Sequence, residues 1–477
     1  MAVAIDLDRV IASREALEKV PAKLAHRLGV LPVALENDTL IVVQCDEDNA
    51  AGIMQLEGQI GLEIRVAPAR RPEGVEKAIR RYYPESAGTG TPLALLEELI
   101  NRAIQIHCSD IHLDTESGRA LVRMRVDGLM RIDRELTPEA MADLVSAVKV
   151  SSRLDISEKR IPQDGQLTIE SLGEEISMRV ATIPTLHGEK LTLRILATAA
   201  TAAELSGIDN LGMRGQHRDM FLSALRQAHG VILLSGPTGS GKTTTLYAAL
   251  RHLRAPGTSH IVSIEDPVEI PLDGVNQVHV DSERVSFNKA LRSVMRHDPD
   301  IIMIGEIRDG ESADIAVKSA LTGHLVLSTL HANDSLSVVT RLANLGVARE
   351  LIVSTLRLVI AQRLVRRPCP HCRRLLPCDG PSADAFRLEP GTAVVEPVGC
   401  QLCGGGYSGR LGLYEMVPIR KRERELIMAG AGTDAMADHA FGGLGLPTLF
   451  QDGRAKAIEH LTTLAEVRRV IYLGEEN

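Results

Sequence analysis

The stretch from Gly236 to Thr243 carries the residue types that bind nucleotide phosphates. It reads Gly-Pro-Thr-Gly-Ser-Gly-Lys-Thr and fits the P-loop pattern in full. Glycines let such a loop turn until its backbone N–H groups converge on phosphate oxygens, and the following helix adds its positive amino-terminal end. Lys242 brings charge to the β- and γ-phosphates, and the Thr243 hydroxyl is placed to bind Mg²⁺. The predicted nucleotide-binding set is Gly236, Pro237, Thr238, Gly239, Ser240, Gly241, Lys242, Thr243 and Thr244.

Acidic residues follow two short apolar runs that lie farther along the chain. Glu306 comes just after the run at 301–304, and Glu265, Asp266 and Glu269 follow the run at 261–264. A carboxylate at the tip of a buried strand beside a P-loop handles Mg²⁺ or the attacking water. Because Glu is one methylene longer than Asp, a water-orienting role fits Glu306 better than metal ligation. For the second group, Mg²⁺ binding, general base catalysis and hydrogen-bond support all stay open.

Two histidines and four arginines are further candidates. His324 and His331 flank the apolar run at 325–327. A neutral histidine can hydrogen-bond a γ-phosphate, and the alternative is a packed structural side chain. The four arginines could together clamp a phosphoryl group, and the alternative for each is a solvated surface position. They are Arg292 and Arg296, which are four residues apart on a predicted helix and share one face, together with Arg179 and Arg194 on predicted strands.

Four cysteines form two Cys-x-x-Cys pairs late in the chain. Cys369 and Cys372 make the first pair, and Cys400 and Cys403 make the second. Each pair can present two thiolates to one tetrahedral Zn²⁺, and four thiolates close the coordination shell, so the predicted site is structural. His371 and Cys378 are substitute ligands, and a redox pair is the weaker alternative because neither pair opens a helix of a thioredoxin-like unit.

The order of apolar runs predicts an α/β chain with several units. Continuous apolar runs at 231–234, 261–264, 301–304 and 325–327 suit parallel strands buried on both faces. Alternating runs at 121–126, 176–180 and 191–195 suit a sheet with one polar face that presents arginines. The linker composition of 84–92 separates the first two units. The units are 1–85, 93–205, 206–366, 367–415 and 416–477, the last being helical.

Composition makes some functions less favoured without excluding them. The net charge of −8 and the aromatic content of 2% argue against a protein that coats nucleic acid, because that needs clustered positive charge and stacking rings. No apolar stretch approaches the roughly 20 residues that span a bilayer, and Met1–Arg14 lacks the apolar core of a secretory signal. We therefore expect a protein of the reducing cytosol, without its own membrane anchor and without direct contact with nucleic acid.

Several segments together resemble one family over about residues 20 to 475. The sequence is similar to the secretion ATPases of the type II secretion and type IV pilus assembly class, which are bacterial cytoplasmic motors. The cysteine pairs and Gly406–Arg410 also look like the metal domain of that family, and Ala332 departs from it at a position where Thr is common. The specific segments are the P-loop, Pro162–Gly165, Arg179–Pro184, Ile264–Glu269, Gly305–Asp309, Thr322–His324 and Ala361–Leu364.

The resemblance implies a fold and a set of roles. It implies a homo-hexameric ring in which a PAS-like α+β domain precedes a RecA-like ATPase core, with ATP and Mg²⁺ between them and a small α/β domain at the N-terminus. Glu306 would be the catalytic acid, the arginine set would reach toward the phosphates, and Glu265, Asp266 and Glu269 would match the family's aspartate box. His324 and His331 would match its histidine box. Residues 1–85 would dock on an inner-membrane platform protein, and whether they bind a cyclic dinucleotide stays open.

The expected function is therefore an ATP-hydrolysing motor. It would be peripheral to the inner membrane through its partners and would power assembly of a pseudopilus or pilus and type II protein secretion. The alternatives are a type IV pilus extension or retraction motor, a DNA-translocating RecA-like ATPase, and a nucleotide-binding switch that barely hydrolyses ATP. The cysteine pairs count against a retraction motor, and Glu306 with the arginine set counts against a switch.

Overall fold

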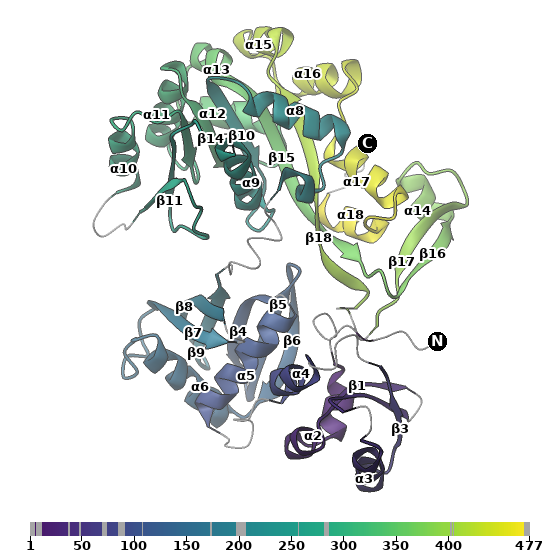
Figure 1. Cartoon of the computed structure of the whole chain (residues 1–477). Coiled ribbons are helices and arrows are strands. Elements are labelled where there is room, and N and C mark those ends of the chain that lie inside the picture. Colours follow the sequence, from purple (N-terminus) through teal and green to yellow (C-terminus); the bar gives the residue numbers. More distant parts are fainter. Residues whose placement is uncertain are drawn as a thin grey trace. The chain divides into compact units, whose positions relative to one another are not determined.

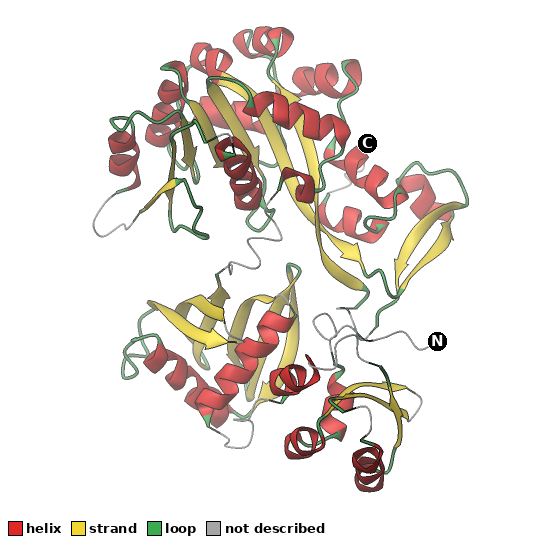
Figure 2. Cartoon of the chain, in the orientation of Figure 1, coloured by secondary structure: helices red, strands yellow, loops and turns green. Residues whose placement is uncertain are grey.

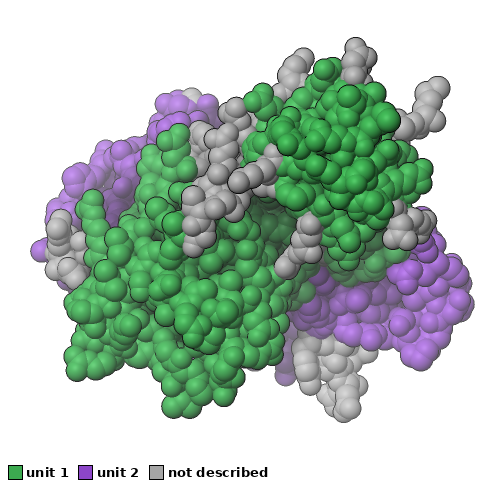
Figure 3. Space-filling model, turned by 90° about the horizontal axis from the view of Figure 1, so that it is seen from below, with its two compact units in different colours: residues 1–198, 369–373, 397–408 green, residues 199–368, 374–396, 409–477 purple. Residues whose placement is uncertain are grey.

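The computed structural model divides the chain into two compact units, which Figure 3 shows in different colours. Unit 1 comprises residues 1–198, 369–373 and 397–408, and unit 2 comprises residues 199–368, 374–396 and 409–477. Most of the linker predicted at 84–92 lies outside the described residues. The residues that the structure describes are 5, 12–36, 39–46, 49–68, 74–83, 91–106, 108–171, 174–196, 207–255, 257–280, 286–400, 403 and 405–471.

The N-terminal part of unit 1 is a small α/β module. Its sheet has the order β1-β2-β3, with β1 antiparallel and β3 parallel to β2. Apolar side chains from the strands and the helices, such as Val30, Leu40 and Leu56, form its core. Its elements are α1 (Arg14–Lys19), α2 (Ala22–Leu28), β1 (Val30–Glu36), β2 (Thr39–Gln44), α3 (Ala50–Ile60), β3 (Glu63–Val66) and α4 (Gly74–Tyr82).

The second part of unit 1 is a six-stranded antiparallel sheet of order β6-β5-β4-β9-β8-β7. Val122, Met124 and Val126 lie on its apolar face, which packs against helices α5 and α6. The alternation predicted for these strands is therefore present. The elements are α5 (Pro92–Gln105), β4 (Cys108–Glu116), β5 (Arg119–Val126), β6 (Leu129–Leu136), α6 (Pro138–Ser151), β7 (Gln163–Ser171), β8 (Glu174–Thr185) and β9 (Gly188–Ile195).

Unit 2 is built on a seven-stranded sheet of order β12-β11-β13-β14-β10-β15-β18. Strand β10 lies between β14 and β15 and runs parallel to both. The sheet and its helices are drawn in Figures 1 and 2. The elements up to β15 are η2 (Ile208–Leu211), α8 (Gly215–Leu225), β10 (Gly230–Ser235), α9 (Lys242–Arg254), β11 (Ile261–Glu265), β12 (Asn276–His279), α10 (Phe287–Val294), β13 (Ile301–Ile304), α11 (Gly310–Leu321), β14 (Leu325–Leu330), α12 (Ser337–Asn344), α13 (Arg349–Thr355) and β15 (Leu356–Pro368).

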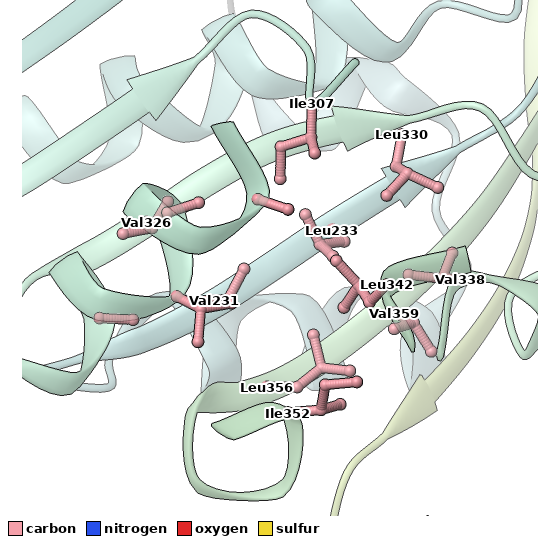
Figure 4. Close-up of a cluster of buried hydrophobic side chains, with 14 of the residues drawn as sticks. Val231, Leu233, Ile307, Val326, Leu330, Val338, Leu342, Ile352, Leu356 and Val359 are labelled. Atoms are coloured by element: carbon pink, nitrogen blue, oxygen red, sulfur yellow. The ribbon is translucent and has the colours of Figure 1, made fainter. Parts of the chain in front are cut away.

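Strand β10 is buried on both faces, as its unbroken apolar run predicts. Val231 and Leu233 pack with the helices from α10 to α13, and Figure 4 shows this cluster with Leu342 of α12 beside Leu233. Ile232 and Leu234 point to the other face, where α8 and α9 cover the sheet. The two layers bury β10 as far as its carboxyl end, which is where the phosphate loop begins.

The C-terminal part of the chain covers the edge of this sheet. Lys456 of α17 donates to the carbonyl of Gly412 at 2.6 Å, and Asp452 of α17 accepts from the backbone N–H of Tyr414 at 2.9 Å. Helix α17 thus satisfies polar groups of edge strand β18 with its side chains. The elements are β16 (Arg373–Cys378), α14 (Gly380–Ala385), β17 (Thr392–Pro397), β18 (Tyr407–Pro418), α15 (Lys421–Met428), α16 (Thr433–Ala437), η3 (Asp438–Gly443), α17 (Leu449–Ile458) and α18 (Leu464–Val470).

The helices of the chain are short. Among the described residues, none has both the length and the apolar character that a bilayer crossing requires.

Glu466 of α18 gives a pH-dependent contribution to the stability of this region. Burial raises the pKa of its carboxyl, but hydrogen bonds from Arg469 and Arg366 outweigh burial and lower the pKa to about 2. Since the unfolded pKa is about 4.3, the carboxylate stabilises the fold at neutral pH, and this stabilisation is lost as the pH falls from about 4 to 2. We expect Glu466→Gln to lower the free energy of unfolding by about 3 kcal/mol at pH 7.

Urea unfolding followed by circular dichroism at pH 7 and pH 3 measures this difference, which should shrink at the lower pH. The control is Glu425→Gln, because Glu425 is half exposed and its ion pair with Arg422 contributes less than about 1 kcal/mol. Equal losses for both variants, or a deficit for Glu466→Gln that does not change with pH, would contradict the prediction.

Candidate active site

The phosphate loop joins β10 to α9 and fits closely against β15. Gly236 and Gly241 have φ of 144° and 85°, in the region that favours glycine. A Cβ at Gly236 would lie 2.5 Å from the carbonyl oxygen of Gln362, and a Cβ at Gly241 would lie 2.8 Å from its side-chain nitrogen. Helix α9 begins without a side-chain cap, which leaves its first N–H groups for an anionic ligand.

Lys242 lies folded over the start of this loop. Its Nζ donates to the carbonyl oxygens of Gly236 at 2.8 Å and Pro237 at 3.0 Å. Burial lowers the pKa of Lys242, Glu306 opposes this effect and Arg363 adds to it. The ammonium group is therefore held where phosphate oxygens can replace the two carbonyl groups as its partners.

Glu306 lies two residues beyond the end of β13 and is held from two sides. One carboxylate oxygen accepts a hydrogen bond from Nε of Arg308, and the other lies 3.3 Å from Nε2 of His331. Arg308 also pairs with Asp266 at 3.3 Å. Because each carboxylate oxygen has two lone pairs, both retain capacity for a water molecule. The structure thus brings Glu306, His331 and Asp266 to the carboxyl edge of the sheet, where the phosphate loop lies.

Glu265 points into the protein interior. It accepts hydrogen bonds from Ser263 at 2.5 Å, from Gln277 at 3.1 Å and from the hydroxyl of Tyr247. Tyr247 in turn accepts from the backbone N–H of Glu269 at 3.3 Å. Of the duties open for this acidic stretch, hydrogen-bond support matches Glu265. The expectation that Glu265 contacts the nucleotide does not fit this buried position, whereas Asp266 is exposed toward Arg308.

His324 lies at the wrong end of the sheet for the role expected of it. It precedes β14, and its carbonyl accepts from the N–H of Gly230, the first residue of β10. The phosphate loop follows the last residue of β10, which is roughly 17 Å away along the strand. Within one chain His324 therefore cannot hydrogen-bond a phosphate at that loop. Its Nδ1 instead lies 2.8 Å from the carbonyl oxygen of Ser319.

Two of the predicted arginines lie in unit 2. Arg292, near the end of α10, pairs with Glu311. Arg296 lies just beyond the helix, which ends at Val294, and its Nη2 donates to the hydroxyl of Ser293 at 3.4 Å.

The other two arginines lie on the polar face of the six-stranded sheet of unit 1. Arg194 donates through Nε to Asp110 at 2.7 Å, and Arg179 lies 3.8 Å from Asp164. Burial raises the pKa of Asp110, but its bonds from Arg194 and Ser109 outweigh burial and lower it. Arg194 is thus held by an ionised carboxylate.

A pocket beside the phosphate loop is lined by predicted site residues together with others, such as Asn333 and Arg363, for which no role was predicted. The pocket has a volume of about 740 Å³, and its walls include Gly236, His331, Asn333 and Arg363. Arg363 donates to the carbonyl oxygen of Asn333 at 2.5 Å. Its neighbour Gln362, almost fully buried, accepts from the hydroxyl of Thr245 at 2.9 Å. The signal that pointed to this pair is the segment Ala361–Leu364, which the family resemblance includes without a role for either residue.

The four cysteine thiols converge as their spacing predicts. The sulfur atoms of Cys369, Cys372, Cys400 and Cys403 lie within 4.8 Å of one another, and these four are the candidate metal ligands found among the described residues. The separations of 3.7 and 3.9 Å between facing sulfurs are far longer than a disulfide bond. They match the edge of about 3.8 Å of a zinc–thiolate tetrahedron. The donor set therefore fits Zn²⁺.

Comparison with known protein families gives two matches. The family model described as "Type II/IV secretion system protein" matches residues 85–469, and the model described as "MshEN domain" matches residues 2–89.

Curated relatives match along most of their length. The protein transport protein HofB homolog of Escherichia coli (strain K12) is 43% identical and covers 79% of this chain and 81% of its own. The type II secretion system ATPase E of Vibrio cholerae is 40% identical and covers 96% and 90%. The type IV pilus assembly ATPase PilB of Myxococcus xanthus is 37% identical and covers 97% and 88%.

Solved structures share the fold. The ATPase DotB of Legionella pneumophila superposes with a TM-score of 0.60 at 20% identity over 81% of this chain and 97% of that one. The pilus retraction motor PilT with bound ADP superposes with a TM-score of 0.55 at 26% identity over 80% and 98%. The α/β architecture is therefore that of the RecA-like secretion ATPases.

The close fit between the loop and β15 makes Gly236 sensitive to substitution. We expect Gly236→Ala to lower the affinity for Mg-ATP at least about tenfold. The added Cβ would collide with the backbone of β15, and alanine disfavours the positive φ that the loop has at this position. Isothermal titration calorimetry measures the affinity, and circular dichroism checks the fold. Gly215→Ala is the control, since a Cβ there meets open space. Unchanged affinity in Gly236→Ala would contradict the tight fit.

Proposed function

The chain belongs to the type II/IV secretion system protein family, and we propose that it powers assembly of a pseudopilus or pilus, and with it type II protein secretion, through an inner-membrane platform. The observation that carries the proposal is the meeting of the phosphate loop, Lys242 and Glu306 at one edge of the sheet. The reaction is hydrolysis of ATP to ADP and phosphate. Domain closure and opening around the nucleotide would deliver the work.

The geometry supports a division of labour in the chemical step. We propose that Lys242 exchanges its two carbonyl partners for oxygens of the β- and γ-phosphates and balances the charge that develops there. Glu306 uses its remaining lone pairs to orient a water molecule toward the γ-phosphorus. Thr243, at the start of α9, is the residue that would hold Mg²⁺, which neutralises phosphate charge when bound. His331, in contact with Glu306, would respond to loss of the γ-phosphate.

The proposal also includes roles for the four predicted arginines, for a homo-hexameric ring and for membrane partners. Arg179, Arg194, Arg292 and Arg296 would stabilise the transferring phosphoryl group, supplied within one subunit or across a homo-hexameric ring. Helices and strands before residue 85 would contact the inner-membrane platform. The motor would work in the cytoplasm and reach the membrane through these partners, as suits relatives named for type II secretion and protein transport.

A pilus extension motor is the second candidate. It is supported by the similarity to PilB over nearly the whole chain. Co-purification of an inner-membrane protein that requires residues 1–85, followed by its identification, distinguishes the two machines.

Glu306→Gln tests the proposed chemistry. We expect kcat for ATP hydrolysis to fall about 100- to 1,000-fold, because the amide orients water poorly, while the affinity for Mg-ATP stays within about threefold. A coupled assay of ADP release and calorimetry give the two quantities. Glu350→Gln on α13 is the control because Glu350 is exposed and distant from the loop. Turnover of Glu306→Gln at the wild-type rate would refute the catalytic assignment.

The cysteine cluster is proposed to bind one Zn²⁺ per chain as a structural site. We expect Cys369→Ser and Cys403→Ser to lose the metal, because three thiolates leave the tetrahedral shell open, and to unfold at a lower temperature. Elemental analysis of purified protein measures zinc, and Cys45→Ser is the control that should retain it. Metal-free wild-type protein with the four thiols reduced would exclude the zinc site.

A further inference from the structure

The loop at 331–335 is held in place by side chains of neighbouring strands. It leaves β14 and enters α12, and it carries His331, whose ring contacts Glu306. It lacks regular hydrogen bonding of its own, so contacts from neighbouring strands must fix its position.

Three neighbouring strands hold three consecutive residues of this loop. Arg363 of β15 donates to the carbonyl of Asn333, and the hydroxyl of Ser235 at the end of β10 donates to the carbonyl of Asp334 at 3.1 Å. Ser335 is held in a different way. Its N–H and hydroxyl both donate to one carboxylate oxygen of Glu415, at 3.1 and 2.6 Å.

Glu415 also reaches the C-terminal helices. It lies on β18, and its second carboxylate oxygen accepts from the N–H of Leu449, the first residue of α17, at 3.2 Å. Its side chain is buried, and burial raises the pKa of the carboxyl, with the hydrogen bonds from Ser335 and Leu449 opposing that effect. A buried carboxylate with these three donors has little freedom to move, so it fixes Ser335 relative to α17.

We infer that Glu415 is a positioning residue for ATP hydrolysis, which sets the place of His331 beside Glu306 by clamping Ser335 to the start of α17. Glu415 does not touch the reacting atoms. It acts on the reaction only through the loop, and it makes the loop and α17 move as one body. This inference rests on the proposed function, because it assigns Glu415 a share in the turnover that the active site carries out.

The donor and the acceptor of the hydrogen bond between Ser335 and Glu415 can be changed separately. We expect Glu415→Gln and Ser335→Ala each to lower kcat for ATP hydrolysis about five- to tenfold, because misplacement of an orienting group is costly in the chemical step. KM for ATP should stay within twofold, since the phosphate loop is untouched. The double variant should be no slower than the slower single variant, because both changes weaken the same contact between Ser335 and residue 415.

The control is Glu423→Gln. Glu423 is an equally buried carboxylate of the C-terminal region that accepts from the N–H of Arg420 and does not contact the loop. Thermal unfolding of each variant confirms that it is folded at the assay temperature, and Ser335→Ala, which removes one hydroxyl, keeps the test available if Glu415→Gln is unstable.

The outcomes separate this inference from the proposed function. Normal wild-type turnover with kcat of both folded variants within twofold of wild type would overturn the inference alone. An equal fall of kcat in Glu423→Gln would also overturn it. So would slower hydrolysis that is caused by a raised KM for ATP while kcat stays at the wild-type value. A well-folded wild-type chain without ATPase activity would overturn the proposed function together with the inference.

Discussion

The parallel alignment of β10, β13 and β14 is the constraint on which the candidate active site depends. Parallel strands bring their carboxyl ends to one edge, so the phosphate loop, Glu306 and His331 meet there although 95 positions separate Gly236 from His331. The alignment is maintained by apolar layers on both faces of β10. A change that tilted β10 would therefore disturb the groups around the nucleotide together.

Much of this arrangement could be predicted from local patterns. The apolar runs identified the central strands β10, β11, β13 and β14, and the P-loop letters placed the phosphate site after the correct strand. The cysteine spacing identified four thiols that the fold brings together. These features are local in sequence, and their physical causes (burial on two faces, glycine at positive φ, thiolate pairs) act over a few residues.

The remainder depends on long-range topology. Strand β15 carries Gln362 and Arg363 within its apolar run, and only its pairing with β10 shows that they face the phosphate loop. His324 and His331 flank the same strand, and the choice between them depends on which end of β14 lies beside the loop. For Glu265, the last residue of its strand, the inward direction is decided by partners such as Ser263 and Gln277. Local secondary-structure propensities do not predict these contacts between residues that are distant in the sequence.

The covering of β18 by α17 has a consequence for partial chains. Side chains of Lys456 and Asp452 hydrogen-bond to backbone groups of edge strand β18. A protein cut before Leu449 would lack these side chains, and its edge strand would expose unpaired backbone groups. Bare strands recruit other chains by backbone pairing. Proteolysis at that point would therefore promote aggregation. Intact protein is needed in any experiment that has to distinguish ring formation from nonspecific association.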